Sequence, residues 1–146
     1  MDKETIFAQS TVNDCRIITL VRNAHENGSL SVVENNGAIP FDIKRVYYLY
    51  DIPGDAERGG HAHIENQSLI ISVSGCFTVT LGDGKEQRSF QLNRPYNALY
   101  VPAGLWREIN DFSSGSVCLV LTSEPYTEDD YVRDYSEFLK LTAPKR

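Results

Sequence analysis

The sequence has no long apolar run and no segment that resembles a targeting signal. No stretch approaches the ~18 consecutive apolar residues that a transmembrane helix needs. The N-terminus, Met-Asp-Lys-Glu-Thr-Ile-Phe, begins acidic and lacks the apolar core of a secretory signal. We therefore expect a cytoplasmic protein without a membrane partner.

Cysteine is scarce, and so is positive charge. The three cysteines are widely spaced and form no CxxC or zinc pattern, as is typical of a chain in a reducing compartment. Cys76 and Cys118 lie in apolar runs and are expected to be small core residues. The net charge of −6 argues against non-specific binding of nucleic acid, although local arginines can still bind a phosphorylated substrate.

Length and patterning indicate a single domain over residues 1–146. A chain of 146 residues, 41% of them hydrophobic, is long enough to bury a substantial core. Short β-rich segments alternate with turn residues every ~8–12 positions, which predicts an all-β antiparallel sandwich or barrel of about eight to ten strands. Apart from the region around His61, the expected strands are 15–21, 30–34, 45–51, 69–73, 76–81, 86–92, 98–101, 106–109 and 116–122.

The N-terminal end of this domain differs from the rest. Residues 1–11 are polar, and we expect them to be flexible. Residues 12–34 are predicted to form a hairpin that turns at Asn27-Gly28-Ser29. An apolar hairpin at a chain end is marginal alone and needs a sheet edge to pair with.

The C-terminal end carries a helical pattern. Thr127 and Asp130 have the spacing of a capping box. The apolar side chains that follow recur at helical spacing, and they are Tyr131, Tyr135, Phe138 and Leu139. We predict a short amphipathic helix near 128–140 whose aromatic face packs against the sheet.

The stretch from Arg58 to Gly75 carries the residues with chemical potential. It begins Arg-Gly-Gly-His-Ala-His, so His61 and His63 lie on the same face if the segment is a strand. Two imidazoles with an arginine nearby can bind a metal or transfer protons. The alternative is that both histidines are ordinary strand residues with satisfied hydrogen bonds.

Two spacings together resemble the cupin superfamily of small jelly-roll barrels. The first is Gly54-x6-His61-x-His63-x3-Gln67-x7-Gly75, and the second is Pro102-Ala-Gly104 followed by Leu105-Trp106-Arg107. In metal-binding cupins the first motif supplies two histidines and a glutamate, and the second supplies another histidine. The resemblance implies a jelly-roll barrel, completed here by the short C-terminal helix.

Two of the four metal-ligand positions of that superfamily are changed in this chain. Gln67 stands at the place of the glutamate and Arg107 at the place of the last histidine. A neutral amide is a weak ligand, and a guanidinium stays protonated and cannot ligate a metal. We therefore expect no bound metal. The candidate catalytic residues are His61 and His63, and the candidate substrate-binding residues are Arg58, Gln67, Arg107, Tyr48 and Tyr50.

A second resemblance is narrower and covers roughly residues 12–140. The chain is similar to the sugar-nucleotide 3,4-ketoisomerases, which act on dTDP-4-keto-6-deoxyglucose. The motifs that carry this likeness are Arg45-Val-Tyr-Tyr-Leu-Tyr-Asp, Arg58-Gly-Gly-His-Ala-His, Leu99-Tyr-Val-Pro, Trp106-x-Glu108, Asp111-Phe-Ser-Ser, Val117-Cys-Leu-Val-Leu and Tyr131-Val-Arg-Asp-Tyr.

This resemblance implies an isomerase without a metal or an organic cofactor. The carbonyl would move from C4 to C3 through an enediol(ate), giving a dTDP-3-keto-6-deoxyhexose for the biosynthesis of deoxyamino sugars of polysaccharides. His61 and His63 would remove the proton at C3 and deliver one at C4, in an order that the sequence leaves open. The resemblance also implies a homodimer in which the two subunits exchange N-terminal strands. Such an exchange would give residues 12–34 a partner.

Two other functions stay open at this point. One is a dTDP-sugar 3,5-epimerase, which uses the same enolisation at other carbons. The other is a non-catalytic cupin that binds a sugar nucleotide. The configuration of the product at C4 is also open, because some ketoisomerases have histidine at the place of Arg107.

Overall fold

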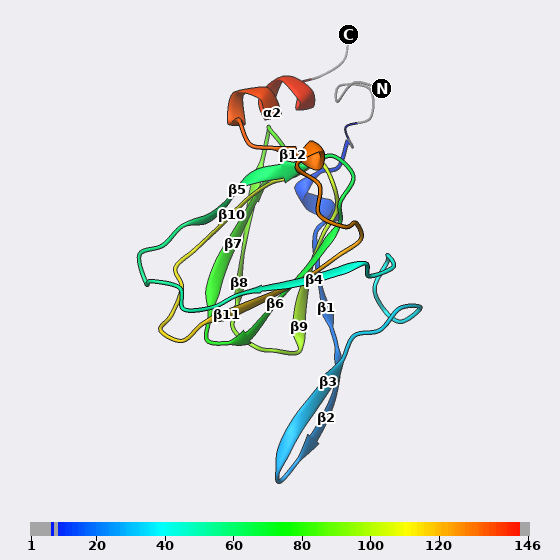
Figure 1. The fold of residues 1–146 in the computed structure, drawn as a ribbon, viewed down its shortest axis with the longest axis vertical. Coiled ribbons are helices and arrows are strands. Elements are labelled where there is room, and N and C mark those ends of the chain that lie inside the picture. Colours follow the sequence, from blue (N-terminus) through cyan, green and yellow to red (C-terminus); the bar gives the residue numbers. More distant parts are fainter. Residues whose placement is uncertain (1–6, 8, 144–146) are drawn as a thin grey trace.

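Two five-stranded antiparallel sheets face each other in the computed structural model, which describes residue 7 and residues 9–143 (Figure 1). The strand order is β1-β9-β6-β11-β4 in the first sheet and β12-β5-β10-β7-β8 in the second. The strands are β1 (Arg16–Thr19), β2 (Val21–His25), β3 (Gly28–Val32), β4 (Arg45–Leu49), β5 (Arg58–His63), β6 (Ser68–Ser74), β7 (Phe77–Gly82), β8 (Gln87–Leu92), β9 (Asn97–Val101), β10 (Trp106–Asn110), β11 (Val117–Thr122) and β12 (Tyr131–Val132). The predicted all-β cupin architecture is confirmed.

The main core lies between the two sheets. Alternation along β7 sends Phe77, Val79 and Leu81 inward, and all three are fully buried. Cys118 on β11 lies in the same core, as predicted, whereas Cys76 at the turn before β7 is only half-buried. Four residues that belong to this core or pack against it also line a cavity: Tyr47, Leu49, Ile109 and Val120.

A second apolar layer covers the outer face of the first sheet. Residues 33–43, between β3 and β4, cross this face and place Ile39 and Phe41 against it. The Phe41 ring contacts Tyr100 at 6.2 Å between ring centroids. The strands of this sheet are therefore apolar on both faces, which accounts for the continuous apolar runs of β6 and β11 in the sequence.

The C-terminal helix α2 (Tyr135–Thr142) starts later than the capping pattern predicted. Its N-cap is Asp134, whose side chain accepts a hydrogen bond from the Ser136 backbone N–H. The side chain of Thr127 makes no capping hydrogen bond, and the next three residues form the 3-10 turn η2 (Glu128–Asp130). The expected helical start is wrong because residues 131–132 extend as β12 and pair with β5 instead.

Helix α2 packs on one end of the outer face of the second sheet, over Ala62 of β5, Trp106 of β10 and Val132 of β12. Phe138 is fully buried against Trp106 of β10 and against Phe7, with ring centroids 5.6 and 6.0 Å apart. The helix thus packs its aromatic side on the back of the strands that line the cavity, as expected. The predicted flexible segment 1–11 lies mostly outside the described residues, but Phe7 within it is buried.

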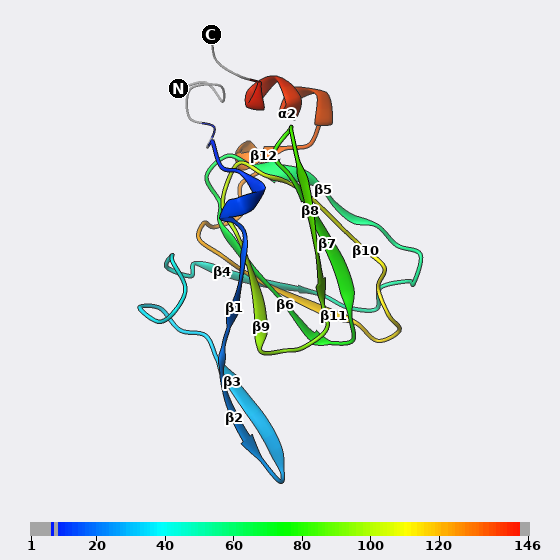
Figure 2. The ribbon, with the colours of Figure 1, turned by 180° about the vertical axis from the view of Figure 1, so that it is seen from behind.

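The hairpin of β2 and β3 projects from the body of the molecule (Figures 1 and 2). The predicted strand 15–21 is divided at Leu20, whose backbone N–H bonds the Tyr96 carbonyl. β1 pairs with β9 of its own chain, whereas every residue of β2 and β3 is exposed. In the part of the chain that is described, no helix is long and apolar enough to cross a membrane.

Candidate active site

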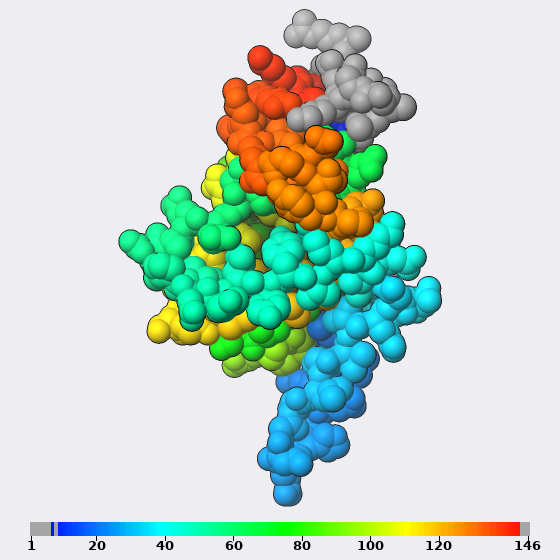
Figure 3. Space-filling view, viewed as in Figure 1, coloured from blue at the N-terminus to red at the C-terminus, as the bar shows by residue number. Residues whose placement is uncertain are grey.

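A cavity of ≈ 530 Å³ opens between the two sheets. Its wall combines four arginines with aromatic and imidazole side chains, contributed by β4, β5, β10, β11 and the segment 123–134 between β11 and α2. The lining residues are Arg45, Tyr47, Leu49, Glu57, Arg58, Gly59, His61, Arg107, Ile109, Val120, Tyr126, Tyr131 and Arg133. In the space-filling view, segment 123–134 (orange) lies above β4 (cyan) on the same face of the molecule (Figure 3).

A β-bulge between β5 and β10 brings His61 and Arg107 together. Arg107 pairs with His61, and the register then shifts so that Glu108 pairs with Gly59. Gly59 and Gly60 both have positive φ, at 89° and 69°. A Cβ on Gly59 would lie 2.9 Å from the Arg107 carbonyl oxygen, so only glycine permits this close approach.

Arg107 is a buried cation without an anionic partner. Its side chain is 2% exposed, and its Nε and Nη1 have no hydrogen-bond partner among the described residues. Burial lowers the pKa of Arg107, but a guanidinium stays charged in proteins. Glu108, the nearest carboxylate in sequence, faces outward and accepts a hydrogen bond from Trp106 Nε1 at 3.2 Å. A buried charge left in this state is ready to bind an oxyanion.

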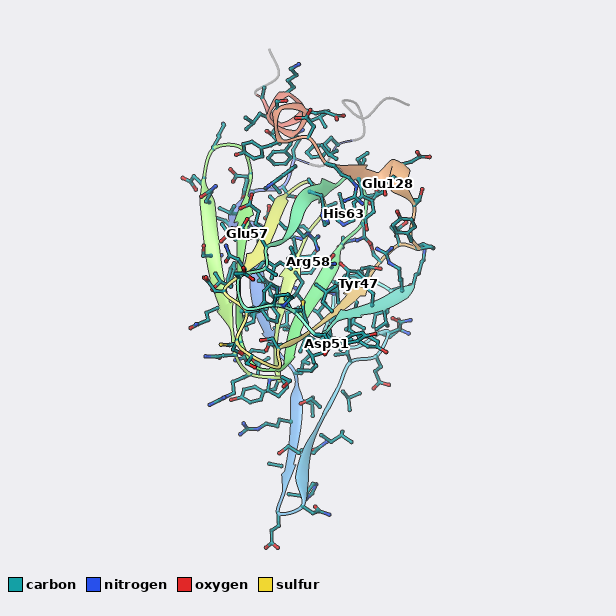
Figure 4. All side chains as sticks on the ribbon, turned by 60° about the vertical axis from the view of Figure 1, so that its left-hand side comes forward. Tyr47, Asp51, Glu57, Arg58, His63 and Glu128 are labelled. Atoms are coloured by element: carbon teal, nitrogen blue, oxygen red, sulfur yellow. The ribbon has the colours of Figure 1, made fainter. Side chains whose placement is uncertain are left out.

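His61 forms part of the cavity wall and His63 lies behind it. The two imidazole centroids are 4.9 Å apart with the rings nearly perpendicular. Tyr131 on β12 packs on both rings, at 4.9 Å from His61 and 4.5 Å from His63. Figure 4 shows His63, Arg58 and Tyr47 on strands around the interior. The predicted common face for the two histidines is therefore correct, but their depths differ.

Asp130 is the polar partner of His63. Its Oδ2 lies 3.0 Å from His63 Nδ1, and its two oxygens also accept the backbone N–H groups of Glu65 and Asn66. Burial opposes ionisation, but these hydrogen bonds outweigh it and hold the pKa of Asp130 below its usual value. The sequence pattern had placed Asp130 in a helix cap, so its role at the site was missed.

Both imidazoles are neutral at physiological pH. Burial, reinforced by the charge of Arg107, lowers the pKa of His61 to about 3. Burial also lowers the pKa of His63, to about 4, against the opposing effect of the hydrogen bond with Asp130. A neutral imidazole offers a nitrogen lone pair and can accept a proton directly.

The tyrosine on β4 that reaches the cavity is Tyr47. Tyr48 and Tyr50, predicted to bind the substrate, do not line this cavity: their side chains are 60% and 62% exposed and line a neighbouring pocket that shares Leu49 and Arg58 with it. Strand alternation sends Tyr47 inward, as the residue between them must point to the other face. Burial raises the pKa of Tyr47, so its phenol remains a hydrogen-bond donor.

Arg58 and Arg107 line the cavity as predicted, whereas Gln67 does not. Gln67 Oε1 accepts a hydrogen bond from Tyr100 at 2.6 Å, on the outer side of the first sheet. Position 67 precedes β6, at the edge of the loop that follows β5. The site therefore lacks the third metal-ligand position of the superfamily and has a cation at the fourth.

These residues do not fit a divalent metal. Over the described residues, no cluster of three or more histidine, cysteine, aspartate or glutamate side chains could hold a metal ion. Catalytic zinc usually has three protein ligands, and the guanidinium of Arg107 would repel a dication. The site instead combines one buried guanidinium with two adjacent imidazoles.

Comparison with known proteins gives the family. The family model described as FdtA, WxcM-like, C-terminal, matches residues 13–143. The chain belongs to this family. A curated relative, the TDP-4-oxo-6-deoxy-α-D-glucose-3,4-oxoisomerase of Aneurinibacillus thermoaerophilus, is 40% identical over 128 residues, which cover 88% of this chain and 92% of the relative.

Solved structures of 3,4-ketoisomerases superimpose closely on the chain. A 3,4-ketoisomerase from Helicobacter canadensis is 41% identical with a TM-score of 0.87, over 90% of this chain and 98% of that one. The QdtA 3,4-ketoisomerase of Thermoanaerobacterium thermosaccharolyticum is 36% identical with a TM-score of 0.86, over 88% and 94% of the chains. That structure is a histidine-to-asparagine variant in complex with TDP-4-keto-6-deoxyglucose.

The pKa values of the two buried histidines predict how stability depends on pH. In the unfolded chain both imidazoles take up a proton near pH 6.5, whereas the native protein resists protonation until about pH 4 for His63 and about pH 3 for His61. The unfolded state therefore binds more protons in this window, and the free energy of unfolding falls as pH falls through it. Each histidine contributes at most about 1.4 kcal/mol per pH unit.

Urea unfolding between pH 7.5 and 4.5 measures this dependence. We expect the H61N/H63N double variant to lose stability less steeply than the original protein as pH is lowered. Equal slopes for the two proteins would contradict the neutral, buried state of the imidazoles.

Proposed function

We propose that this protein is a dTDP-4-keto-6-deoxyglucose 3,4-ketoisomerase. Its product would be a dTDP-3-keto-6-deoxyhexose. The observation that carries the proposal is the pair of neutral imidazoles, His61 and His63, beside the buried and unpaired guanidinium of Arg107. A proton acceptor next to a site for an oxyanion is what enolisation of a keto sugar requires.

The reaction needs no oxidant or reductant. One imidazole removes the proton from C3, the C3–H electron pair forms the C3=C4 bond, and the C4 carbonyl oxygen takes up the negative charge. The proton of the C3 hydroxyl then passes to the C4 oxygen, the C3 oxygen becomes the carbonyl, and the electron pair of the C3=C4 bond takes up a proton at C4. The carbonyl moves by one carbon, and the substrate and product are isomers.

Arg107 is proposed to bind the oxygens of the enediolate. Its planar fork can donate to both adjacent oxygens, and its Nε and Nη1 are free to do so. Because the donor is already desolvated, its interaction with the developing charge is stronger than it would be in water. The phenol of Tyr47 lines the same cavity and is a further donor.

The remaining arginines are proposed to bind the diphosphate of the nucleotide. Arg45, Arg58 and Arg133 line the same cavity and are less buried than Arg107, and Arg133 is also paired with Glu128. They concentrate positive charge at this place in a chain of net charge −6. Phosphate oxygens are the ligands that arginine binds best.

The two alternative functions have less support. A dTDP-4-dehydrorhamnose 3,5-epimerase, that of Bacillus anthracis, shares the fold with a TM-score of 0.72 but is only 14% identical. A non-catalytic binding protein would have no need of a buried pair of neutral imidazoles. The relatives of higher identity are ketoisomerases.

A homodimer with exchanged N-terminal strands is part of the proposal. The projecting hairpin exposes Val21 (66%) and Leu30 (55%), and a lone hairpin is marginally stable. β4, at the edge of the first sheet, offers unpaired backbone groups to a second copy. Since β1 pairs within its own chain, the element offered for exchange is residues 21–32 rather than all of 12–34.

Sedimentation velocity tests the dimer. We expect the original protein to sediment as a dimer and the V21D/L30D variant to sediment as a monomer. The matched control is L139D, which alters another exposed leucine on α2 at the opposite end of the molecule (Figure 1). A monomeric original protein, or a dimer unaffected by V21D/L30D, would contradict this part of the proposal.

The reaction is proposed to take place in the cytoplasm. A 3-keto sugar nucleotide is the natural substrate for transamination, so the product would enter the synthesis of a deoxyamino sugar for polysaccharides. The cytoplasm supplies nucleotide sugars and keeps the three cysteines, all free in this structure, reduced.

Single histidine variants test the catalytic assignment. We expect H61N and H63N each to reduce turnover of dTDP-4-keto-6-deoxyglucose at least ~10²-fold, because each removes an acid–base group. Product formation is followed by proton NMR, and circular dichroism checks that both variants stay folded. Activity within a few-fold of the original protein in both variants would contradict the assignment.

Chelation tests the proposal that no metal takes part. We expect full activity after dialysis against EDTA, because the cavity offers too few metal ligands. Loss of activity that zinc, iron or manganese restores would instead indicate a metal-dependent enzyme.

A further inference from the structure

We propose that Asp130 is a positioning residue that holds His63 in a single tautomer, with the proton on Nδ1 and the lone pair on Nε2. This inference rests on the proposed function for its catalytic meaning. Its structural content, the tautomer, concerns the free protein and does not depend on any substrate.

The hydrogen bonds around Asp130 determine which atom donates. Glu65 N–H donates to Oδ1 at 2.8 Å and Asn66 N–H donates to Oδ2 at 3.2 Å. Both donors favour an ionised carboxylate, which can only accept. The contact of 3.0 Å between Oδ2 and His63 Nδ1 therefore requires the hydrogen to be on Nδ1. The Nε2 atom is then the basic nitrogen.

His63 Nε2 has no partner of its own. The side chain is 2% exposed, and Nε2 has no hydrogen bond to any residue that the structure describes. The ring lies behind His61 and Tyr131, at 4.9 and 4.5 Å between centroids. A buried lone pair next to the cavity wall is suited to holding a proton during the reaction and has no evident structural use.

The charged groups around the two imidazoles favour protonation of His63 over protonation of His61. Asp130 stabilises the imidazolium of His63, whereas the cations Arg107 on β10 and Arg45 on β4 oppose it. His61 faces Arg107, Arg133 and His63 and has no carboxylate in hydrogen-bond contact. Tyr131 packs on both rings from β12 and contributes no carboxylate. The two imidazoles are thus unequal in proton affinity.

The backbone around Asp130 is fixed at both ends of segment 123–134. The Asp130 carbonyl accepts a hydrogen bond from Ile64 N–H at 2.9 Å. At the start of the segment, the buried side chain of Asn66 accepts a hydrogen bond from Glu124 N–H at 3.1 Å. Because the loop after β5 holds the segment at two points, the carboxylate keeps one position relative to the His63 ring.

Nitrogen-15 NMR of the free original protein tests the tautomer directly. We expect the Nδ1 and Nε2 shifts of His63 near neutral pH to show a protonated Nδ1 and a bare Nε2, whereas H63N identifies the signals by their loss. A bare Nδ1, or shifts that average the two tautomers, would overturn the proposal. This reading holds even if the protein proves inactive on dTDP-4-keto-6-deoxyglucose, in which case only the proposed function fails.

The D130N variant tests the catalytic consequence. Its amide can donate to Nδ1, which moves the His63 proton to Nε2 and removes the lone pair, so we expect kcat to fall ~10²–10⁴-fold with KM within a few-fold. D129N is the matched control, because Asp129 is an exposed carboxylate one residue away in the same turn. A D130N enzyme that folds and keeps kcat within three-fold of D129N would overturn the positioning role. If D130N does not fold, the NMR result for the original protein decides.

Discussion

The structure depends on one cation buried without a counter-ion. Arg107 extends from β10 into the space between the sheets, and neither Nε nor Nη1 meets an acceptor in the described part of the chain. Burying such a charge costs free energy that the rest of the barrel has to offset. The same charge lowers the pKa of the neighbouring histidines and leaves a strong donor ready for an anionic intermediate.

Each neighbouring element serves to place groups around that cation. The glycine bulge in β5 sets His61 opposite Arg107, and segment 123–134 brings Asp130 and Tyr131 to His63. Helix α2 closes the back of these strands with Phe138. The proposed catalytic groups therefore stand on paired strands, and α2 covers the outer side of these strands at Ala62 and Trp106. Such paired strands are the rigid support that proton transfer at defined carbons requires.

The parts of this arrangement that follow strand periodicity could be predicted from the sequence. The common face of His61 and His63, the opposite faces of the neighbours Arg107 and Glu108, and most strand positions along the chain follow from alternation and turn residues. The choice between Tyr47 and its neighbours could not, because alternation alone does not say which face of β4 is inside. Asp130 was hidden for a different reason: its contact with His63 spans 67 residues, and the local spacing with Thr127 imitates a helix cap. Gln67 lies outside the cavity. Its placement could not be predicted because the resemblance gives its position in a motif but not the direction of its side chain.

The central claim is that the imidazole pair and Arg107 move a carbonyl by one carbon. The most direct measurement is proton NMR of dTDP-4-keto-6-deoxyglucose incubated with the protein in D₂O. The account predicts loss of the C3 proton signal and a product whose carbonyl is at C3, with hydrogen or deuterium newly placed at C4. A spectrum that stays unchanged, or one that keeps the carbonyl at C4 while deuterium enters C3 and C5, would contradict it.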